Sequence, residues 1–282
     1  MAILPRHRLA ELGRPTLDRV LCAVDGSRAS AEAIREALAV ATCATRLSFI
    51  AITDEAEGDA HRVASLAAHR ARQTLEEARS LAAARALPAE TKLVRAASVV
   101  ETLIDQAVAT TLLVVGSHGG ALSAEPPNGS VATALAGRAA GPLLIARAGA
   151  AARGAQPRIL VAVDDSAAAV PLAALAGSIA AACHGHVHLV HVQGRGYGSH
   201  TRHRLAELST ALIEQTGSEP VVEVACSANV GAHICRVAQD SESSVVVVGR
   251  RQAAARRSVA AVDERVVQDA ACSVLVVPTP AA

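Results

Sequence analysis

Aromatic residues and lysine are almost absent from this chain of 282 residues. It has no tryptophan, one phenylalanine (Phe49), one tyrosine (Tyr197) and one lysine (Lys92), so arginine carries nearly all of its positive charge. The formal net charge is +1, and a near-neutral chain without aromatic residues among basic ones is not typical of a nucleic-acid-binding protein. A single lysine also leaves little room for a P-loop lysine or for a Schiff-base enzyme.

Long apolar runs and paired cysteine motifs are missing as well. No uninterrupted apolar segment reaches the roughly 18 to 20 residues that span a bilayer, and the N-terminal sequence does not resemble a signal peptide. Because 51% of the residues are hydrophobic, disorder is disfavoured. The six cysteines form no CxxC pair, so we expect reduced thiols in a cytoplasmic protein, with a redox or metal role as the alternative. They are Cys22, Cys43, Cys183, Cys226, Cys235 and Cys272.

The chain contains an internal duplication. Three segments recur in the same order, namely RVLCAVDGS (19–27) as RILVAVDDS (158–166), LLVVGS (112–117) as VVVVGR (245–250), and GPLLIAR (141–147) as CSVLVVP (272–278). The offset shrinks along the chain from 139 to 131 residues, which indicates one duplicated unit with short deletions in the second copy. We predict a first repeat at 1–148 with an intact motif, a linker at 149–157, and a second repeat at 158–282 with a degenerate motif.

Within each repeat, short Val- and Leu-rich runs alternate with longer Ala-rich segments of helical periodicity. Strands are predicted at 19–25, 46–53, 91–96, 112–116 and 142–147, and again at 158–164, 186–192, 220–226, 244–249 and 273–278. Helices are predicted at 27–43, 61–87, 98–109 and 130–139, and again at 167–183, 202–216, 229–239 and 259–271. This alternation predicts an α/β fold of two tandem doubly wound, Rossmann-like domains, each with a mostly five-stranded parallel sheet and helices on both faces.

The chemistry is expected at the ends of the first and fourth strands. Ligands of an open α/β sheet bind beyond the carboxyl ends of its strands, where the strand order reverses. Asp25 follows the first strand, and GSHGGALSAEPPNGSV follows the fourth. Gly116 and Gly119 allow sharp turns close to a ligand, while Gly129 and Ser130 open a helix whose free N–H groups accept phosphate. The alternative is that these glycines only shape a loop.

This motif, G-x2-G-x9-G-[ST] with an aspartate after the first strand, resembles the ATP-binding members of the universal stress protein family. The resemblance covers nearly the whole chain as two tandem copies. It implies that Asp25 contacts the adenine and ribose end of the nucleotide and that Ile52 contacts adenine through its backbone. It also implies that the residues of GSHG and GSV bind ribose and phosphates. Those residues are Gly116, Ser117, His118, Gly119, Gly129, Ser130 and Val131.

The resemblance implies a stress-response regulatory protein that binds ATP. The sequence shows no obvious base that would position water, so we do not expect an enzyme. The alternatives are a nucleotide-independent interaction protein with a vestigial motif, and a slow ATPase. Glu125, Pro126 and Pro127 replace the basic residues that family loops often carry, so ADP or AMP could compete with ATP. Mg²⁺ could accompany the nucleotide. Phe49 is the only aromatic residue that could lie near, so adenine is expected between aliphatic side chains and backbone.

The same resemblance implies how the two repeats, and whole chains, associate. Single-repeat relatives pair through their last strands, so 142–147 and 273–278 are expected to join the repeats as a pseudo-dimer. An edge strand left open would present unpaired backbone groups, which supports this pairing. Whole chains are expected to form a homodimer. We expect neither a nucleic-acid nor a membrane partner, and the sequence identifies no protein partner.

The second repeat departs from the motif. Gln252 stands at the position of Gly119, and Ala260 and Ala261 stand at those of Gly129 and Ser130. We therefore expect a degenerate, empty site. The alternative, with Asp164 as the retained carboxylate, is an anion patch of Arg250, Arg251, Arg256 and Arg257. Four histidines are expected to be structural. A metal site is the alternative, and we do not predict one. They are His184, His186, His188 and His191.

Overall fold

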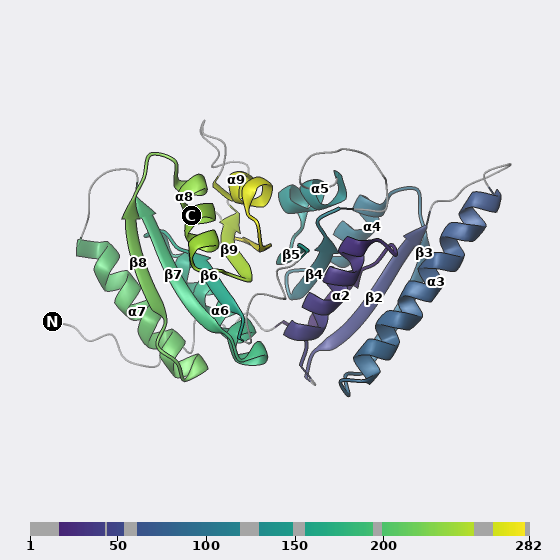
Figure 1. Cartoon of the computed structure of the whole chain (residues 1–282), viewed down its shortest axis with the longest axis horizontal. Coiled ribbons are helices and arrows are strands. Elements are labelled where there is room, and N and C mark those ends of the chain that lie inside the picture. Colours follow the sequence, from purple (N-terminus) through teal and green to yellow (C-terminus); the bar gives the residue numbers. More distant parts are fainter. Residues whose placement is uncertain are drawn as a thin grey trace.

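The computed structural model of the chain describes residues 17–42, 44–53, 61–118, 130–148, 156–193, 199–250 and 262–279 (Figure 1). In the first repeat the elements are β1 (Arg19–Ala23), α2 (Arg28–Val40), β2 (Arg46–Thr53), α3 (His61–Ala83), β3 (Ala89–Arg95), α4 (Val99–Gln106), β4 (Thr111–Gly116), α5 (Ser130–Arg138) and β5 (Leu143–Ala146). In the second repeat they are β6 (Arg158–Ala162), α6 (Ala169–Cys183), β7 (His186–Gln193), α7 (Ser199–Thr216), β8 (Val221–Cys226), α8 (Val230–Asp240), β9 (Val245–Arg250), α9 (Val262–Asp269) and β10 (Ser273–Pro278).

These strands form one continuous sheet. The strand order is β3-β2-β1-β4-β5-β10-β9-β6-β7-β8, so each repeat contributes the same doubly wound half. Pairing is parallel within each repeat, whereas β5 and β10 pair antiparallel, with Leu144 opposite Leu275. The predicted α/β class is confirmed, and so is the expected packing of the two last strands. The two predicted sheets are therefore joined edge to edge as one.

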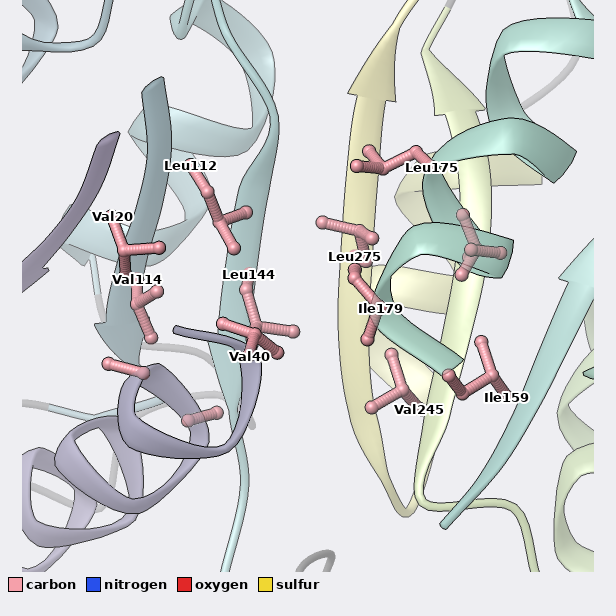
Figure 2. Packing of buried hydrophobic residues seen from close by; sticks show 14 of the residues in the cluster. Val20, Val40, Leu112, Val114, Leu144, Ile159, Leu175, Ile179, Val245 and Leu275 are labelled. Carbon is pink, nitrogen blue, oxygen red and sulfur yellow. The ribbon is translucent and has the colours of Figure 1, made fainter. Parts of the chain in front are cut away.

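Helices cover both faces of this sheet, and each hydrophobic core runs across both repeats. One core lies under α2, α3, α6 and α7, and the other lies under α4, α5, α8 and α9. Figure 2 shows the first core at the junction, with Leu144 and Val114 from one repeat and Leu275 and Ile179 from the other. No helix among the described residues is both long and apolar enough to cross a membrane.

Several helices begin at a polar side chain that caps their free N–H groups. Ser27 caps α2 by accepting a hydrogen bond from the backbone N–H of Ser30, and Ser98 and Asn229 cap α4 and α8 in the same way. At α2 the cap is Ser27, the residue just before the helix begins. The cap also places the preceding residue, Gly26, in the turn between β1 and α2.

Candidate functional site

The point where the strand order reverses lies between β1 and β4. From β1 the chain passes to α2 on one face, and the helix that follows β4, α5, covers the other face. The turns that follow these two strands therefore meet at the carboxyl ends of the strands. A hydrogen bond of 3.5 Å from the Ser27 hydroxyl to the backbone carbonyl of His118 links them directly. An open α/β sheet binds its ligands beyond the carboxyl ends of the strands at such a switch point.

Asp25 lies exposed in the first of these turns. Its Oδ1 accepts a hydrogen bond from the backbone N–H of Ser27 at 2.9 Å, and its own N–H donates to Ser30 Oγ at 3.2 Å. Gly26 has a φ of 79°, and a Cβ there would lie 3.1 Å from Thr74 Oγ1. The local sequence D-G-S thus fixes the position of the Asp25 carboxylate in the turn after β1.

Gly116, the last residue of β4, is required for packing. A Cβ at this position would lie 2.8 Å from the carbonyl carbon and the Cβ of Ala29, in the first turn of α2. The motif alone attributes this glycine to a sharp turn near a ligand. The structure gives it a second reason, because only glycine lets α2 approach β4 so closely.

Ser117 and His118 continue from β4 into the second turn. Ser117 is buried, and its N–H donates to the carbonyl of Ala146 in β5 at 2.9 Å. Its hydroxyl forms a hydrogen bond of 2.9 Å with Nδ1 of the exposed His118. These contacts anchor the start of the GSHG segment, whose Gly119 lies outside the described residues, as does Gly129.

Ile52 and Val131 belong to the α4/α5 side of the sheet. Both are partly buried against the core on that side, as is Val94, which lies opposite Ile52 in β3. Phe49 is fully buried in the core of the opposite face. Phe49 therefore packs on the face of the sheet opposite to Ile52, Val94 and Val131. The backbone of α5 begins at Ser130, as predicted.

In the second repeat the corresponding turn is built differently. Asp164 accepts a hydrogen bond from the N–H of Ser166 at 3.0 Å, the counterpart of the Asp25 contact. Asp165, at the position of Gly26, accepts a hydrogen bond of 3.1 Å from the hydroxyl of the buried Thr201. Thr201 in turn accepts from Gln193 at 2.9 Å. This chain of contacts ties α7 to the turn after β6.

Arg250 is not part of an anion patch, contrary to the alternative that the sequence leaves open. Its guanidinium is buried, and it donates to the backbone carbonyls of Ala136 and Ala139 at 2.8 and 2.5 Å. Both carbonyls lie at the end of α5 in the first repeat. The sequence does not indicate this partner, because it lies in the other repeat. The remaining arginines of the expected patch, Arg251, Arg256 and Arg257, lie outside the described residues.

The histidines of β7 have structural partners. His188 lies 3.4 Å from Glu223 of β8, while His191 Nδ1 lies 3.0 Å from the carbonyl oxygen of Val163. Burial lowers the pKa of His188 in spite of that carboxylate. The sequence pattern does not reveal Glu223 as a partner, because only the pairing of β7 with β8 brings it near. Among the described residues, no three His, Cys, Asp or Glu side chains are grouped to hold a metal ion.

Each described cysteine is a free thiol, as expected. Cys22 and Cys272 are buried, Cys183 and Cys235 are half-buried, and Cys226 is exposed. Burial raises the pKa of the Cys22 thiol, so this residue stays protonated and unreactive at neutral pH. A catalytic thiolate is therefore not found at the end of β1, although Cys22 is close in sequence to Asp25.

Known proteins share both the sequence pattern and the fold. The universal stress protein family matches residues 16–147 and 157–278. A universal stress protein from Archaeoglobus fulgidus DSM 4304 is 17% identical with a TM-score of 0.68, over 93% of this chain and 98% of that chain. Proteins from Pseudomonas aeruginosa strains UCBPP-PA14 and PAO1 are each 15% identical over 94% of both chains, with TM-scores of 0.60 and 0.57. No curated protein matches the sequence.

Proposed function

Since the chain belongs to the universal stress protein family, we propose that its first repeat binds an adenine nucleotide and that it acts as a stress-response regulator. ATP is the expected ligand, with ADP or AMP as competitors. The observation that carries this proposal is the meeting of the two turns at the switch point, where Ser27 contacts His118 beside the exposed Asp25. This is where a doubly wound sheet offers a crevice for a nucleotide.

Each part of the nucleotide would find a suitable group. The Asp25 carboxylate can accept a hydrogen bond from a ribose hydroxyl or from the adenine amino group. The partly buried Ile52, Val94 and Val131 offer an apolar surface for the base. The start of α5 offers free N–H groups and the positive end of the helix dipole to the phosphates. Mg²⁺ would bind through the phosphates.

We further propose that the nucleotide is held without turnover. Near the turns, Asp25 Oδ1 is already engaged with the Ser27 N–H, and His118 Nδ1 is already engaged with the Ser117 hydroxyl. Both side chains thus shape the turns, and we assign Asp25 to ligand binding and not to proton transfer. Incubation of the purified protein with ATP and Mg²⁺ should release no phosphate above the buffer blank. Sustained release that depends on Asp25 would instead identify a slow ATPase.

Isothermal titration with ATP tests the binding proposal through a matched pair of variants. Asp25→Ala removes the carboxylate from the first repeat, and Asp164→Ala removes its counterpart from the second, which accepts hydrogen bonds from the N–H and the hydroxyl of Ser166. A hydrogen bond to a charged group contributes about 1.5 to 3 kcal/mol, so Asp25→Ala should weaken binding by about tenfold to a hundredfold. Asp164→Ala should leave the affinity unchanged.

Two results would contradict the proposal. If the wild-type chain takes up no ATP, ADP or AMP at near-millimolar concentration, the chain is a nucleotide-independent interaction protein with a vestigial motif. If Asp164→Ala weakens binding as much as Asp25→Ala does, the site is not in the first repeat. Circular dichroism of both variants shows whether each is folded.

A homodimer and a cytoplasmic location complete the proposal. The described cysteines are thiols, which suits a reducing compartment. Because β5 and β10 already pair with each other, a dimer of whole chains must use another surface. Light scattering on the 28.6 kDa chain should give about twice the mass of one chain at micromolar concentration, and the mass of a single chain would contradict a stable dimer.

A further inference from the structure

The end of α5 is held by a residue from the other repeat. Arg250 at the end of β9 donates one guanidinium hydrogen bond to the carbonyl of Ala136 and a second to that of Ala139, at 2.8 and 2.5 Å. Only 8% of Arg250 is exposed, and Ala139 is fully buried. Arg250 and the end of α5 therefore meet in the junction between the repeats, where α5 also packs against α9 (Figure 1).

These contacts satisfy groups that a helix leaves open. The last carbonyls of an α-helix have no partner within the helix, and a buried one costs free energy when it stays unpaired. A positive charge at this end also interacts favourably with the helix dipole. Arg250 supplies the charge and two donors in a fixed geometry. The second repeat thus fixes the last turn of a helix that belongs to the first repeat.

The position of Arg250 in its own repeat adds to this observation. It follows Gly249 as Ser117 follows Gly116, so it stands where a nucleotide-binding loop would begin in the second repeat. One residue difference therefore has two effects. It removes the serine hydroxyl from the second repeat, and it places a guanidinium on the helix that carries the proposed phosphate contacts of the first.

We infer that Arg250 is a positioning residue for nucleotide binding in the first repeat, an inference that rests on the function proposed above. α5 has nine residues, which span about 13 Å, so its first turn moves with its last turn as one short rigid element. By holding the last turn, Arg250 fixes the direction of the N–H groups at the first. The second repeat has thereby become a support for the site of the first.

The same junction contains a matched control. Arg147, just after β5, donates to the carbonyls of Val267 and Ala270 at the end of α9. As with Arg250, a guanidinium donates to the last carbonyls of a helix in the other repeat. Here the arginine belongs to the first repeat and the helix to the second. α9 belongs to the second repeat, so its position does not aim groups at the proposed site. Loss of Arg147 should therefore weaken the junction without changing nucleotide binding.

The test compares Arg250→Met, Arg250→Lys and Arg147→Met in the full chain by ATP titration and by thermal unfolding. Methionine keeps an apolar side chain of similar length but donates no hydrogen bond. We expect both methionine variants to lower Tm. Only Arg250→Met should also weaken ATP binding, by about tenfold, which is typical of coupling between two sites. Lysine restores a charge and places its N–H donors on a single nitrogen, without the planar fork of arginine, so Arg250→Lys should recover part of the affinity.

Hydrogen exchange gives a second readout, in which each variant is compared with itself in the presence and absence of ATP. Because coupling is reciprocal, ATP should increase the protection of the Ala139 N–H, which bonds to the Leu135 carbonyl at the end of α5. The increase should be present in the wild type and in Arg147→Met, and smaller in Arg250→Met.

The outcomes separate the two proposals. If the wild type binds no adenine nucleotide, the proposed function fails, and this inference fails with it. If the wild type binds ATP and Arg250→Met binds it equally well, the proposed function stands and the positioning role is overturned. Equal losses of affinity in Arg250→Met and Arg147→Met would also overturn it, because they would indicate general loosening of the junction.

Discussion

Glu36 is a carboxylate buried between the repeats. It lies in α2, and its Oε1 accepts a hydrogen bond of 2.8 Å from the hydroxyl of Ser273 in β10. Burial is the largest influence and raises the pKa of Glu36. The Ser273 hydrogen bond and Arg35 lower it in part, and Glu32 raises it. Cys183 also faces this group, and burial raises the pKa of that thiol.

We predict that Glu36→Gln stabilises the chain at neutral pH but not in acid. Below the ordinary pKa of about 4.5, Glu36 is protonated in both the folded and the unfolded state. As the pH rises from there to the raised pKa, the unfolded state loses its proton first, so the wild type loses stability relative to Glu36→Gln. Guanidinium unfolding between pH 4 and 8 should show this difference growing and then levelling off.

A control with the opposite sign is Glu76→Gln. Glu76 is exposed, and the hydrogen bond from Arg79 lowers its pKa, so the wild type gains stability there as the pH rises. A difference between wild type and Glu36→Gln that does not depend on pH would contradict the account of Glu36.

The glycines at 116 and 137 should respond to alanine in opposite directions. Because a Cβ at Gly116 would lie 2.8 Å from Ala29, Gly116→Ala should push α2 away from β4 and cost about 1 to 3 kcal/mol. Gly137 lies in α5, and a Cβ there would meet nothing within 4 Å, so Gly137→Ala should stabilise by about 0.5 to 1 kcal/mol. Denaturant unfolding followed by circular dichroism measures both. Equal effects would contradict the packing role of Gly116.

At the scale of single residues, the sequence predicts local contacts better than distant ones. The placement of Asp25 after β1 and the start of α5 at Ser130 follow from short motifs. The roles of Arg250 and Glu36 could not be predicted, because their partners lie more than 100 residues away. The motif marks Gly116, but the close approach of Ala29 requires the packed structure.

At the scale of elements, the predicted helices and strands agree with the structure to within a few residues. Apolar runs flanked by Gly, Ser and Asp mark the strands, and caps mark several helices. The placement of α7 was not predictable. It packs closely on α6 because Gly177 leaves room for Gln215, which donates to the Ala174 carbonyl and to Ser178. The residue of the first repeat that corresponds to Gly177, 139 positions earlier in the chain, is Leu38 in α2.

The two outer strands of the sheet differ in a way that predicts aggregation behaviour. β3 carries Glu90, Lys92 and Arg95, and charges on an edge strand disfavour pairing with other chains. β8 is mostly apolar, and Val221 is 60% exposed. Val221→Lys should therefore raise the temperature at which the protein aggregates, and Lys92→Val should lower it. Light scattering during heating measures both, and no change in either variant would contradict this difference between the edges.

In the whole molecule, the two repeats are joined into one structural unit. The sheet is continuous through β5 and β10, and each core contains residues of both repeats. The duplication and the pairing of the last strands are predictable from the sequence. The extent of the shared cores is not, because it depends on which helices meet across the junction.

This continuity predicts cooperative unfolding. Leu144 and Leu275 lie opposite each other and are almost fully buried, so Leu144→Ala and Leu275→Ala should each cost about 2 to 5 kcal/mol. Both should shift one shared transition in guanidinium, followed by circular dichroism. Two separate transitions, with only the mutated repeat affected, would contradict a single unfolding unit.

We propose that the chain holds one adenine nucleotide, and that it does so in the first repeat. The most direct test is to load the protein with ATP, remove excess ligand, denature it, and measure the released nucleotide per chain by mass spectrometry. The wild type and Asp164→Ala should each release about one adenine nucleotide per chain, and Asp25→Ala should release far less. No nucleotide in the wild type, or two per chain, would contradict it.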